Sequence, residues 1–314
     1  MDSPQTVQVE HLADIYRLLD NIFRGTPDAS RQRVRTDFPL FFAANNLRNR
    51  RVVIHQGQII CHAGFWPRSL KVANVTLKAA VVVLVATHPD YRHRGCAAIC
   101  MKSLQQQLQN EHYDLGILWT GVPGFYEPLG WKTAVPPGCY LNRIATGMSC
   151  LNHHLSSVIP FEIRKYSEAD HFHDIMALQR QQPARILRSP ADFRQLLSLP
   201  GIQAWGVQRK TTEAYIVTGA AVNKRGILEY AGRADDVLAG IAKLVQEQHL
   251  DPSAPLPVFG TDSDMAALLH AHQIPMTPLA SSKGHGTEMR LVLNGQRVTD
   301  FVQNELFVWG LDWA

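Results

Sequence analysis

Residues 81–97 of this 314-residue chain read VVVLVATHPDYRHRGCA. The apolar, β-branched run at 81–86 predicts a buried strand, and the polar turn after it leads into a helical pattern over 95–111. Gly95 and Ala97 are small enough to let a ligand approach the backbone at the start of that helix. Unpaired amides and the positive end of the helix dipole favour an anion there. The stretch therefore predicts an α/β protein with a turn that binds a pyrophosphate.

Two common phosphate-binding motifs do not occur in this turn. It contains neither the G-x-x-x-x-G-K-S/T pattern of a P-loop nor the G-x-G-x-x-G pattern of a dinucleotide site. It does contain Arg92-x-x-Gly95-x-Ala97. Three fixed positions in six residues are a weak signal, because an ordinary helix start with small packing residues gives the same pattern.

A second motif follows in the same strand-then-helix context. Residues 115–120, LGILWT, predict another short buried strand, and residues 125–131 read FYEPLGW. Together, R-x-x-G-x-A and F-Y-x-x-x-G-W resemble the two signatures of the GCN5-related N-acetyltransferase (GNAT) superfamily, in the order expected for it. The resemblance implies a mixed-sheet α/β fold and acetyl-CoA as cosubstrate, with no metal.

The resemblance also implies roles for individual residues. The backbone at the end of the strand at 81–86 lines the pantetheine arm of the cofactor. The turn after that strand holds the pyrophosphate, and two further cofactor-binding residues follow the strand at 115–120. In that order these cofactor-binding positions are Val85, Ala86 and Thr87; Arg92, His93, Arg94, Gly95, Cys96, Ala97 and Ala98; and Gly121 and Val122. Cys96 is interpreted as a small packing residue, since direct acetyl transfer needs no enzyme thiol.

Tyr126 is the candidate general acid, which protonates the departing CoA sulfur. A tyrosine that only stacks on the cofactor arm is the alternative. The general base stays open, because the strand at Val81–Val85 carries no carboxylate. Ordered water, His88 or the terminal carboxylate of Ala314 could each serve.

The second half of the chain repeats the order of elements of the first with little sequence identity. We expect a catalytic domain at 1–145, a linker at 146–160, a degenerate GNAT-like domain at 161–295 and a docked tail at 296–314. The degenerate copy has Asp235 and Asp236 at its strand-to-helix junction. These carboxylates would repel a pyrophosphate.

Composition agrees with a two-domain globular protein. Hydrophobic residues make up 46% of the chain and the net charge is only +4. The five cysteines show no C-x-x-C spacing, and the N-terminus does not resemble a signal peptide, which predicts a cytoplasmic protein. No apolar run reaches about 18 residues, so we expect no membrane span. We also expect no binding of nucleic acid. Arginines gather at positions 31, 33, 35, 48, 50 and 51, and form either a solvated face or a rim that attracts an anion.

Within the superfamily, the arrangement most resembles Eis-type acetyltransferases without their sterol-carrier-like third domain. We therefore expect direct transfer of an acetyl group to a primary amine. The alternative is a CoA-binding regulator that has lost turnover; a transferase using charged tRNA is disfavoured by the CoA-type motif. The acceptor, the acyl length and the assembly, including a homo-oligomer, stay open.

Overall fold

The computed structural model describes residues 3–25, 34–134, 138–142, 160–221, 224–251, 255–258, 263–278 and 287–298. The described residues divide into two compact units. Unit 1 contains residues 3–134 and 287–298, and unit 2 contains residues 138–278. Each unit is built on its own mixed sheet.

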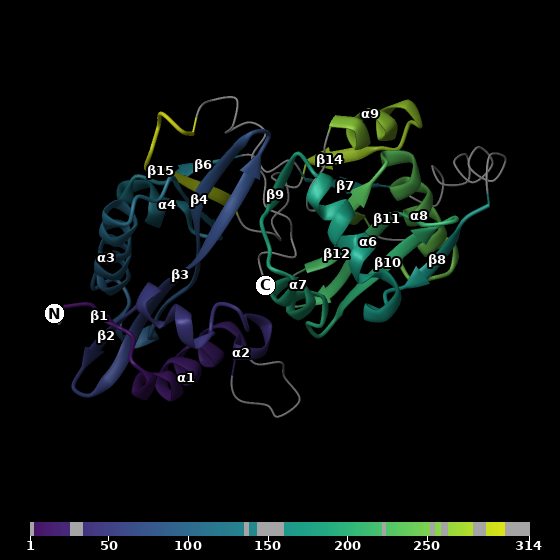
Figure 1. Ribbon diagram of the computed structural model, residues 1–314. Helices are drawn as coiled ribbons and strands as arrows, with labels where there is room; N and C mark the ends of the chain where they lie inside the picture. The colour runs from purple at the N-terminus through teal and green to yellow at the C-terminus, as the bar shows by residue number, and fades with distance from the viewer. Residues whose placement is uncertain are drawn as a thin grey trace. The chain divides into compact units, whose positions relative to one another are not determined.

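Unit 1 is a twisted sheet with helices packed against it (Figure 1). Its strands are β1 (Gln5–Thr6), β2 (Arg50–His55), β3 (Gln58–Val72), β4 (Val75–Thr87), β5 (Leu115–Thr120), β6 (Lys132–Thr133) and β15 (Thr287–Val292). Its α-helices are α1 (Leu12–Phe23), α2 (Val34–Asp37), α3 (Cys96–Asn110) and α4 (Pro123–Tyr126). The strand order is β1-β2-β3-β4-β5-β15-β6, and β4 and β5 form a parallel pair among antiparallel neighbours.

The β3–β4 hairpin is longer than the sequence pattern predicts. Strands were expected at 58–65 and 77–86, but pairing continues to Val72 and Val75. Residues 66–72 include Pro67, which has no backbone N–H, and the charged Arg68 and Lys71, so the apolar run ends before the strand does. The hairpin carries the end of β4 to the turn that precedes α3.

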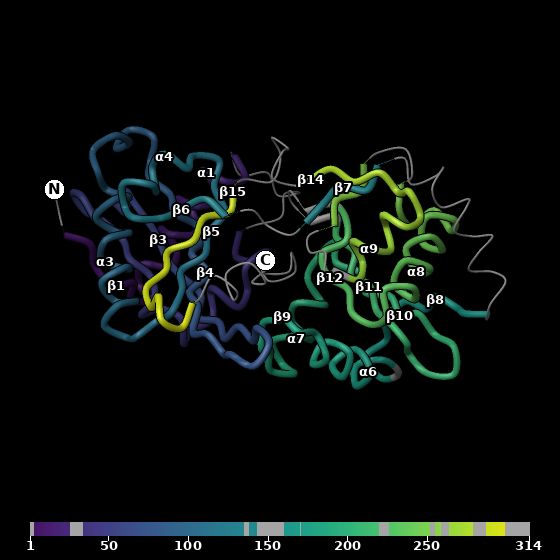
Figure 2. Tube along the Cα trace, turned by 90° about the horizontal axis from the view of Figure 1, so that it is seen from above, coloured from purple at the N-terminus to yellow at the C-terminus, as the bar shows by residue number. Residues whose placement is uncertain are grey.

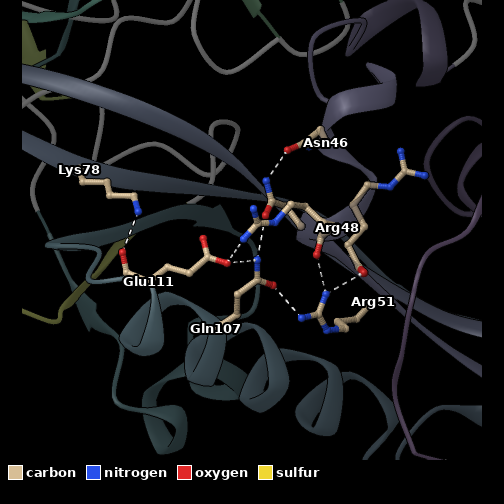
Figure 3. A network of polar contacts seen from close by, with 8 residues as sticks. Asn46, Arg48, Arg51, Lys78, Gln107 and Glu111 are labelled. Carbon is tan, nitrogen blue, oxygen red and sulfur yellow. Dashed lines mark hydrogen bonds and ion pairs between the residues drawn. The ribbon is translucent and has the colours of Figure 1, made fainter.

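Helix α3 packs on one face of this sheet. Leu104 and Leu108 are fully buried against a core that includes Phe65 and Leu118. Polar contacts fix the other end of the same interface (Figure 3). Arg51 of β2 donates to Ser103 Oγ at 3.0 Å and to the Gln107 side chain at 2.7 Å. These bonds show that Arg51 faces α3.

The same network joins further polar groups around α3 (Figure 3). Gln107 donates to Asn49 and to Glu111, both at 2.9 Å, and Lys78 Nζ donates to the Glu111 carbonyl at 2.7 Å. Arg48 forms an ion pair with Glu111. The helix is thus held in one orientation along the sheet, and its N-terminus is held in place relative to β4.

Unit 2 has the same topology as unit 1. Its strands are β7 (Cys139–Leu141), β8 (Glu162–Lys165), β9 (Ala184–Ile186), β10 (Ile202–Gln208), β11 (Thr212–Ala221), β12 (Lys224–Gly232), β13 (Leu256–Val258) and β14 (Met276–Pro278). Its helices are α6 (Glu168–Gln181), α7 (Pro190–Leu197), α8 (Ala234–Gln246) and α9 (Ser263–Ala271). The sheet order β8-β10-β11-β12-β13-β7-β14 matches that of unit 1 strand for strand, with β12 and β13 as its parallel pair. The fold is therefore a tandem of GNAT-like mixed sheets, as the sequence predicted.

The two halves exchange one strand, which corrects the expected boundaries. A last strand of the first domain was predicted near 131–142, and the region up to 295 was assigned to the second domain. Instead β7 pairs with β13 and β14 in the sheet of unit 2. Strand β15 pairs with β5 and β6 in unit 1, where it lies alongside β5 (Figure 2). Each sheet is completed by a strand from the other half of the sequence.

Two other expectations meet the limits of the structure. Residues 28–33 of the expected helix from Asp28 to Asn45 lie outside the described residues, and its described part contains α2 and the start of a 3-10 helix at Ala44–Asn49. Residues 146–159 of the expected linker and residues 299–314 of the expected tail lie outside the described residues.

Candidate active site

Strands β4 and β5 separate at the centre of unit 1. Their parallel register runs from the Ala79–Leu115 pair to the Val81–Ile117 pair and then stops. Beyond Val81, β4 continues for six more residues, and its edge on the β5 side no longer pairs with β5. Backbone groups of Val85, Ala86 and Thr87, predicted to bind the cofactor, lie on this free section.

A bulge bends β4 within the free section. Its pairing with β3 passes from Gly64–Val83 to His62–Ala86, so two β4 residues oppose one β3 residue. Leu84 has φ of 55°, which is the left-handed region that a branched apolar residue rarely adopts. Its carbonyl lies 2.8 Å from Nδ1 of the buried His62. Strained backbone of this kind tends to occur at functional sites.

The turn after β4 has the features of an anion site. Residues 92–95 are exposed, and Gly95 is the N-cap of α3 with φ of 80°. No side chain of the described residues caps this helix, and its first turn has no acidic residue. A Cβ added to Gly95 would meet nothing within 4 Å. The first amides of α3 are therefore available to a ligand.

A cavity of about 590 Å³ adjoins this turn. Its lining includes His88 and Arg92 of the turn, Arg17 of α1 and the β2–β3 hairpin at Gly57. Arg92 Nε donates to the Thr87 carbonyl at 3.4 Å, which orients its side chain beside the end of β4. Cationic groups thus border a hollow next to the free helix terminus.

Tyr126 lies in the short helix after β5. It is 7% exposed, and its ring contacts those of Phe125 and Trp131 edge to face. Gly130 has φ of 88° and turns the chain so that Trp131 packs over Gly116, where a Cβ would lie 2.8 Å from the indole. These contacts explain why the F-Y-x-x-x-G-W pattern requires a glycine and a large aromatic residue.

Burial raises the pKa of Tyr126 to about 12, and its hydrogen bond with Thr120 only partly opposes that shift. The phenol therefore stays protonated across the physiological range. Thr120 is the last residue of β5 and also accepts from the Val122 amide at 3.0 Å. Tyr126 thus presents a proton near the end of β5, beside the point where β4 and β5 diverge.

The remaining predicted residues have different surroundings. Gly121 and Val122 are exposed, and Val122 is 62% exposed. Cys96 is buried, and desolvation raises the pKa of its thiol, which agrees with a packing role. His88 Nδ1 accepts from the Asp90 amide at 3.4 Å. Ala314, a candidate base, lies outside the described residues.

Sequence reasoning missed two buried polar residues. Arg50 was assigned to a solvated face or a charged rim, but it is 0% exposed, and His62 is 0% exposed as well. Burial lowers the pKa of Arg50 to about 10 and that of His62 to about 3. The signal that could have found Arg50 is its position next to Arg51 in a strand, because adjacent strand residues face opposite sides of the sheet.

Unit 2 has an acidic helix terminus at the equivalent place. Helix α8, which follows β12 as α3 follows β4, has Asp235 and Asp236 in its first turn. Asp236 is 4% exposed and pairs with Arg209 at 2.7 Å. The two carboxylates would repel an anion from this terminus.

Neither a metal site nor a membrane span emerges from the described residues. Among them, no cluster of His, Cys, Asp or Glu side chains could hold a metal ion. None of the described helices is long and apolar enough to cross a membrane.

Unit 1 thus combines a parallel strand pair that separates with an uncapped helix N-terminus at the end of one of those strands. A sequence model of the acetyltransferase (GNAT) domain matches residues 4–134. This region is therefore a GNAT domain, as its two motifs predicted, and the match supports a general acyltransferase role. A search of curated proteins gives no match.

Solved structures share the fold over nearly the whole chain. A conserved protein from Enterococcus faecalis, described as a probable N-acyltransferase, has a TM-score of 0.69 at 15% identity, covering 95% of this chain and 74% of its own. A GCN5-related N-acetyltransferase from Kribbella flavida has a TM-score of 0.67 at 12% identity, covering 94% and 73%. Eis1 from Mycobacterium abscessus has a TM-score of 0.60 at 12% identity, covering 93% and 74%.

Proposed function

We propose that this protein is an acetyl-CoA-dependent N-acetyltransferase that acts on a primary amine by direct transfer. The observation that supports this most is the uncapped N-terminus of α3 behind Gly95, at the end of the strand that separates from β5. The amides of Cys96, Ala97 and Ala98 and the side chains of Arg92 and Arg94 bind the pyrophosphate. His93, with φ of 61°, contributes through the bend it gives the turn.

The acyl arm lies along the free edge of β4 at residues 85–87, next to Gly121 and Val122. A backbone N–H at the β4 bulge donates to the thioester oxygen and stabilises the charge that develops on it. The neutral amine attacks the carbonyl carbon, the C–N bond forms and the C–S bond breaks. Tyr126 gives its proton to the leaving sulfur, and the proton lost by the amine returns through solvent to the phenolate.

A phenol with a pKa near 12 is a weak acid toward a thiolate whose ordinary pKa lies near 8.5. Transfer of its proton to a free thiolate is therefore unfavourable by about 3.5 pKa units. It accompanies C–S cleavage and depends on the phenolate recovering the proton that the acylated amine releases. Burial serves a second purpose, because it ensures that the hydroxyl carries a proton when the cosubstrate binds.

Replacement of Tyr126 by Phe tests this role. We expect kcat for thiol release from acetyl-CoA, measured across a panel of amines, to fall about 10²–10⁴-fold with unchanged CoA affinity. Tyr113→Phe is the matched control. Tyr113 is also buried in unit 1, burial also raises its pKa to about 12, and it packs against Phe65 on the α3 side.

Two outcomes would contradict the proposal in different ways. Full turnover by Tyr126→Phe would remove the general-acid role and leave the acetyltransferase intact. Tight CoA binding by the parent protein, with no thiol release for any amine, would favour a CoA-binding regulator instead.

A further inference from the structure

Two fully buried polar side chains of unit 1 carry nitrogen atoms without a hydrogen-bond partner. Among the described residues, Nε, Nη1 and Nη2 of Arg50 and Nε2 of His62 have no such partner. Both residues are 0% exposed. Burying a charged group without a partner costs several kcal/mol, so folded proteins rarely retain one without a use.

The two side chains share one face of the sheet. Arg50 pairs with Gly64, and Val52 pairs with His62, so Arg50 and His62 are diagonal neighbours on adjacent strands. This is the face opposite α3, because Arg51 on the alternate face bonds to that helix. Gly64 leaves room for the guanidinium stem, since a Cβ there would lie 2.8 Å from Arg50 Cγ.

Aromatic rings hold the guanidinium without satisfying it. Its central carbon lies 5.5 Å from the Phe41 ring centroid and 5.1 Å from that of Phe42. Asn46 fixes this segment, because its side chain donates to the carbonyls of Phe41 and Phe65. Ring faces attract a cation, but they accept none of its five N–H groups in the way that an anion would.

The imidazole has a defined polarity. Its Nδ1 lies 2.8 Å from the Leu84 carbonyl, which can only accept, so Nδ1 carries the proton. Nε2 of the neutral ring is then an acceptor, and the lowered pKa of His62 agrees with a neutral ring. This buried face of the sheet therefore offers several donors on Arg50 and one acceptor on His62.

A ligand that satisfies both groups needs an anionic acceptor and an N–H donor close together. We propose that Arg50 and His62 bind the acceptor substrate, and that it is an amine with a neighbouring carboxylate, as in a free α-amino acid. Arg50 takes the carboxylate, and His62 Nε2 accepts a hydrogen bond from the amino group. This inference rests on the proposed function and names the substrate class of the same site.

The location fits an acceptor site. His62 is bonded to Leu84 at the β4 bulge, and the free edge of β4 that we assign to the acyl arm begins there. An amine held by His62 Nε2 thus lies one side chain away from that strand. Phe42 is 9% exposed and Phe41 is 0% exposed, so a ligand that reaches Arg50 has to displace the Phe42 ring.

Paired acceptors give the first test. Thiol release is measured with α-amino acids, with their carboxamides and with the corresponding amines that lack the carboxylate. We expect kcat/KM to be at least 100-fold higher for the acids. Equal rates for acids and amides would overturn this inference and leave the acetyltransferase standing. If no amine supports turnover, the same pairs are compared by the thermal shift of the CoA-bound protein, and an equal shift for acid and amide overturns it.

Arg50→Met gives the second test, with Arg51→Met as the matched control on the same strand. Arg50→Met removes an unpartnered charge, so we expect an unchanged or higher Tm, unchanged CoA affinity and a fall of at least 100-fold in kcat/KM for the amino acid. Arg51→Met removes satisfied bonds to α3, so we expect a lower Tm with an unchanged KM for the amino acid. An Arg50→Met protein that keeps the parent KM would overturn the assignment.

Discussion

The N-termini of α3 and α8 occupy the same place in two sheets of the same strand order, but they differ in what fills them. In α3, Gly95 precedes Cys96, Ala97 and Ala98, and no described side chain caps the helix. In α8, the equivalent second and third positions are Asp235 and Asp236. The first turn of α3 has no acidic side chain to repel an external anion, whereas the first turn of α8 has two.

Buried arginines show the same contrast. Arg50 in unit 1 lies against Phe41 and Phe42 and has no carboxylate partner among the described residues. Arg188 in unit 2 lies 4.8 Å from the Phe193 ring centroid and forms two hydrogen bonds with Glu229, at 2.9 and 2.5 Å. The buried guanidinium in unit 2 thus has a carboxylate partner within its own unit, whereas the one in unit 1 has none among the described residues. We infer that unit 1 binds the ligand and that unit 2 has a structural role.

The largest predicted effect comes from breaking the internal pair of unit 2. Glu229→Gln leaves the Arg188 charge buried at 0% side-chain exposure, and we expect it to lower the free energy of unfolding by about 3–5 kcal/mol. Urea unfolding and loss of amide protection in β11 and β12 measure this. The double variant Arg188→Met, Glu229→Leu removes both charges and should be markedly more stable than Glu229→Gln. Equal stability of the two proteins would show that the pair is not structural.

The second prediction transfers the acidic turn of α8 to α3. Ala97→Asp with Ala98→Asp places two carboxylates where we expect the pyrophosphate. Two like charges at close range should weaken CoA binding by about 100- to 1000-fold. The helix itself should be as stable as before, because acidic residues in a first turn contribute about 0.3–1 kcal/mol each.

Ala97→Asn with Ala98→Asn is the matched control, because asparagine has the size of aspartate without its charge. Calorimetry with CoA should show a much smaller loss for this protein. If the two double variants bound CoA equally weakly, size rather than charge would distinguish the α3 terminus from that of α8.

Much of the contrast between the helix termini was predictable from sequence. The run at 81–86, the strand at 115–120 and the helix from 95 are local patterns, and the structure confirms them closely. The exchange of β7 and β15 was not predictable, because an apolar strand specifies its buried face but not which sheet it joins. Only the pairing partners of these short strands distinguish the two arrangements.

The residues of the proposed acceptor site were harder to predict from sequence than those of the proposed cofactor site. The α3 turn depends on neighbouring residues in the chain, so its chemistry appears in six consecutive letters. Arg50 and His62 come together only through the register of β2 with β3. Alternation places Arg50 on the face opposite Arg51, but only the Phe41 and Phe42 segment folded over it makes that face buried.

The third prediction tests the backbone of the open terminus. Gly95→Ala forces a Cβ into a left-handed conformation at φ of 80°, which costs about 1–2 kcal/mol, even though the surrounding space is empty. If the turn relaxes to relieve this strain, the α3 amides lose their alignment, and we expect CoA to bind about tenfold more weakly. Calorimetry and thermal unfolding measure the two effects.

Gly124→Ala is the control for that change. Gly124 is also surrounded by open space, but it lies in α4 without a positive φ. Alanine in a helix is favoured over glycine by about 0.5–1 kcal/mol, so this change should stabilise the protein slightly. Gly95→Asn should recover part of the lost affinity, because asparagine tolerates the left-handed region. Equal effects of alanine at positions 95 and 124 would remove the backbone argument.

The last prediction concerns the buried imidazole that unit 1 keeps neutral. The pKa of His62 is about 3 in the folded protein, against an ordinary value near 6.5. Below pH 6.5 the unfolded chain takes up a proton that folded His62 does not, so the unfolded state binds more protons and stability falls as pH falls. The slope approaches about 1.4 kcal/mol per pH unit between these two values.

His62→Gln keeps a donor toward the Leu84 carbonyl and removes the titration. The difference in urea midpoint between parent and variant should therefore change in favour of the variant as pH falls from 6.5 to 4.5. A constant difference would show that folded His62 takes up a proton as readily as the unfolded chain does, and would contradict an imidazole that burial keeps neutral.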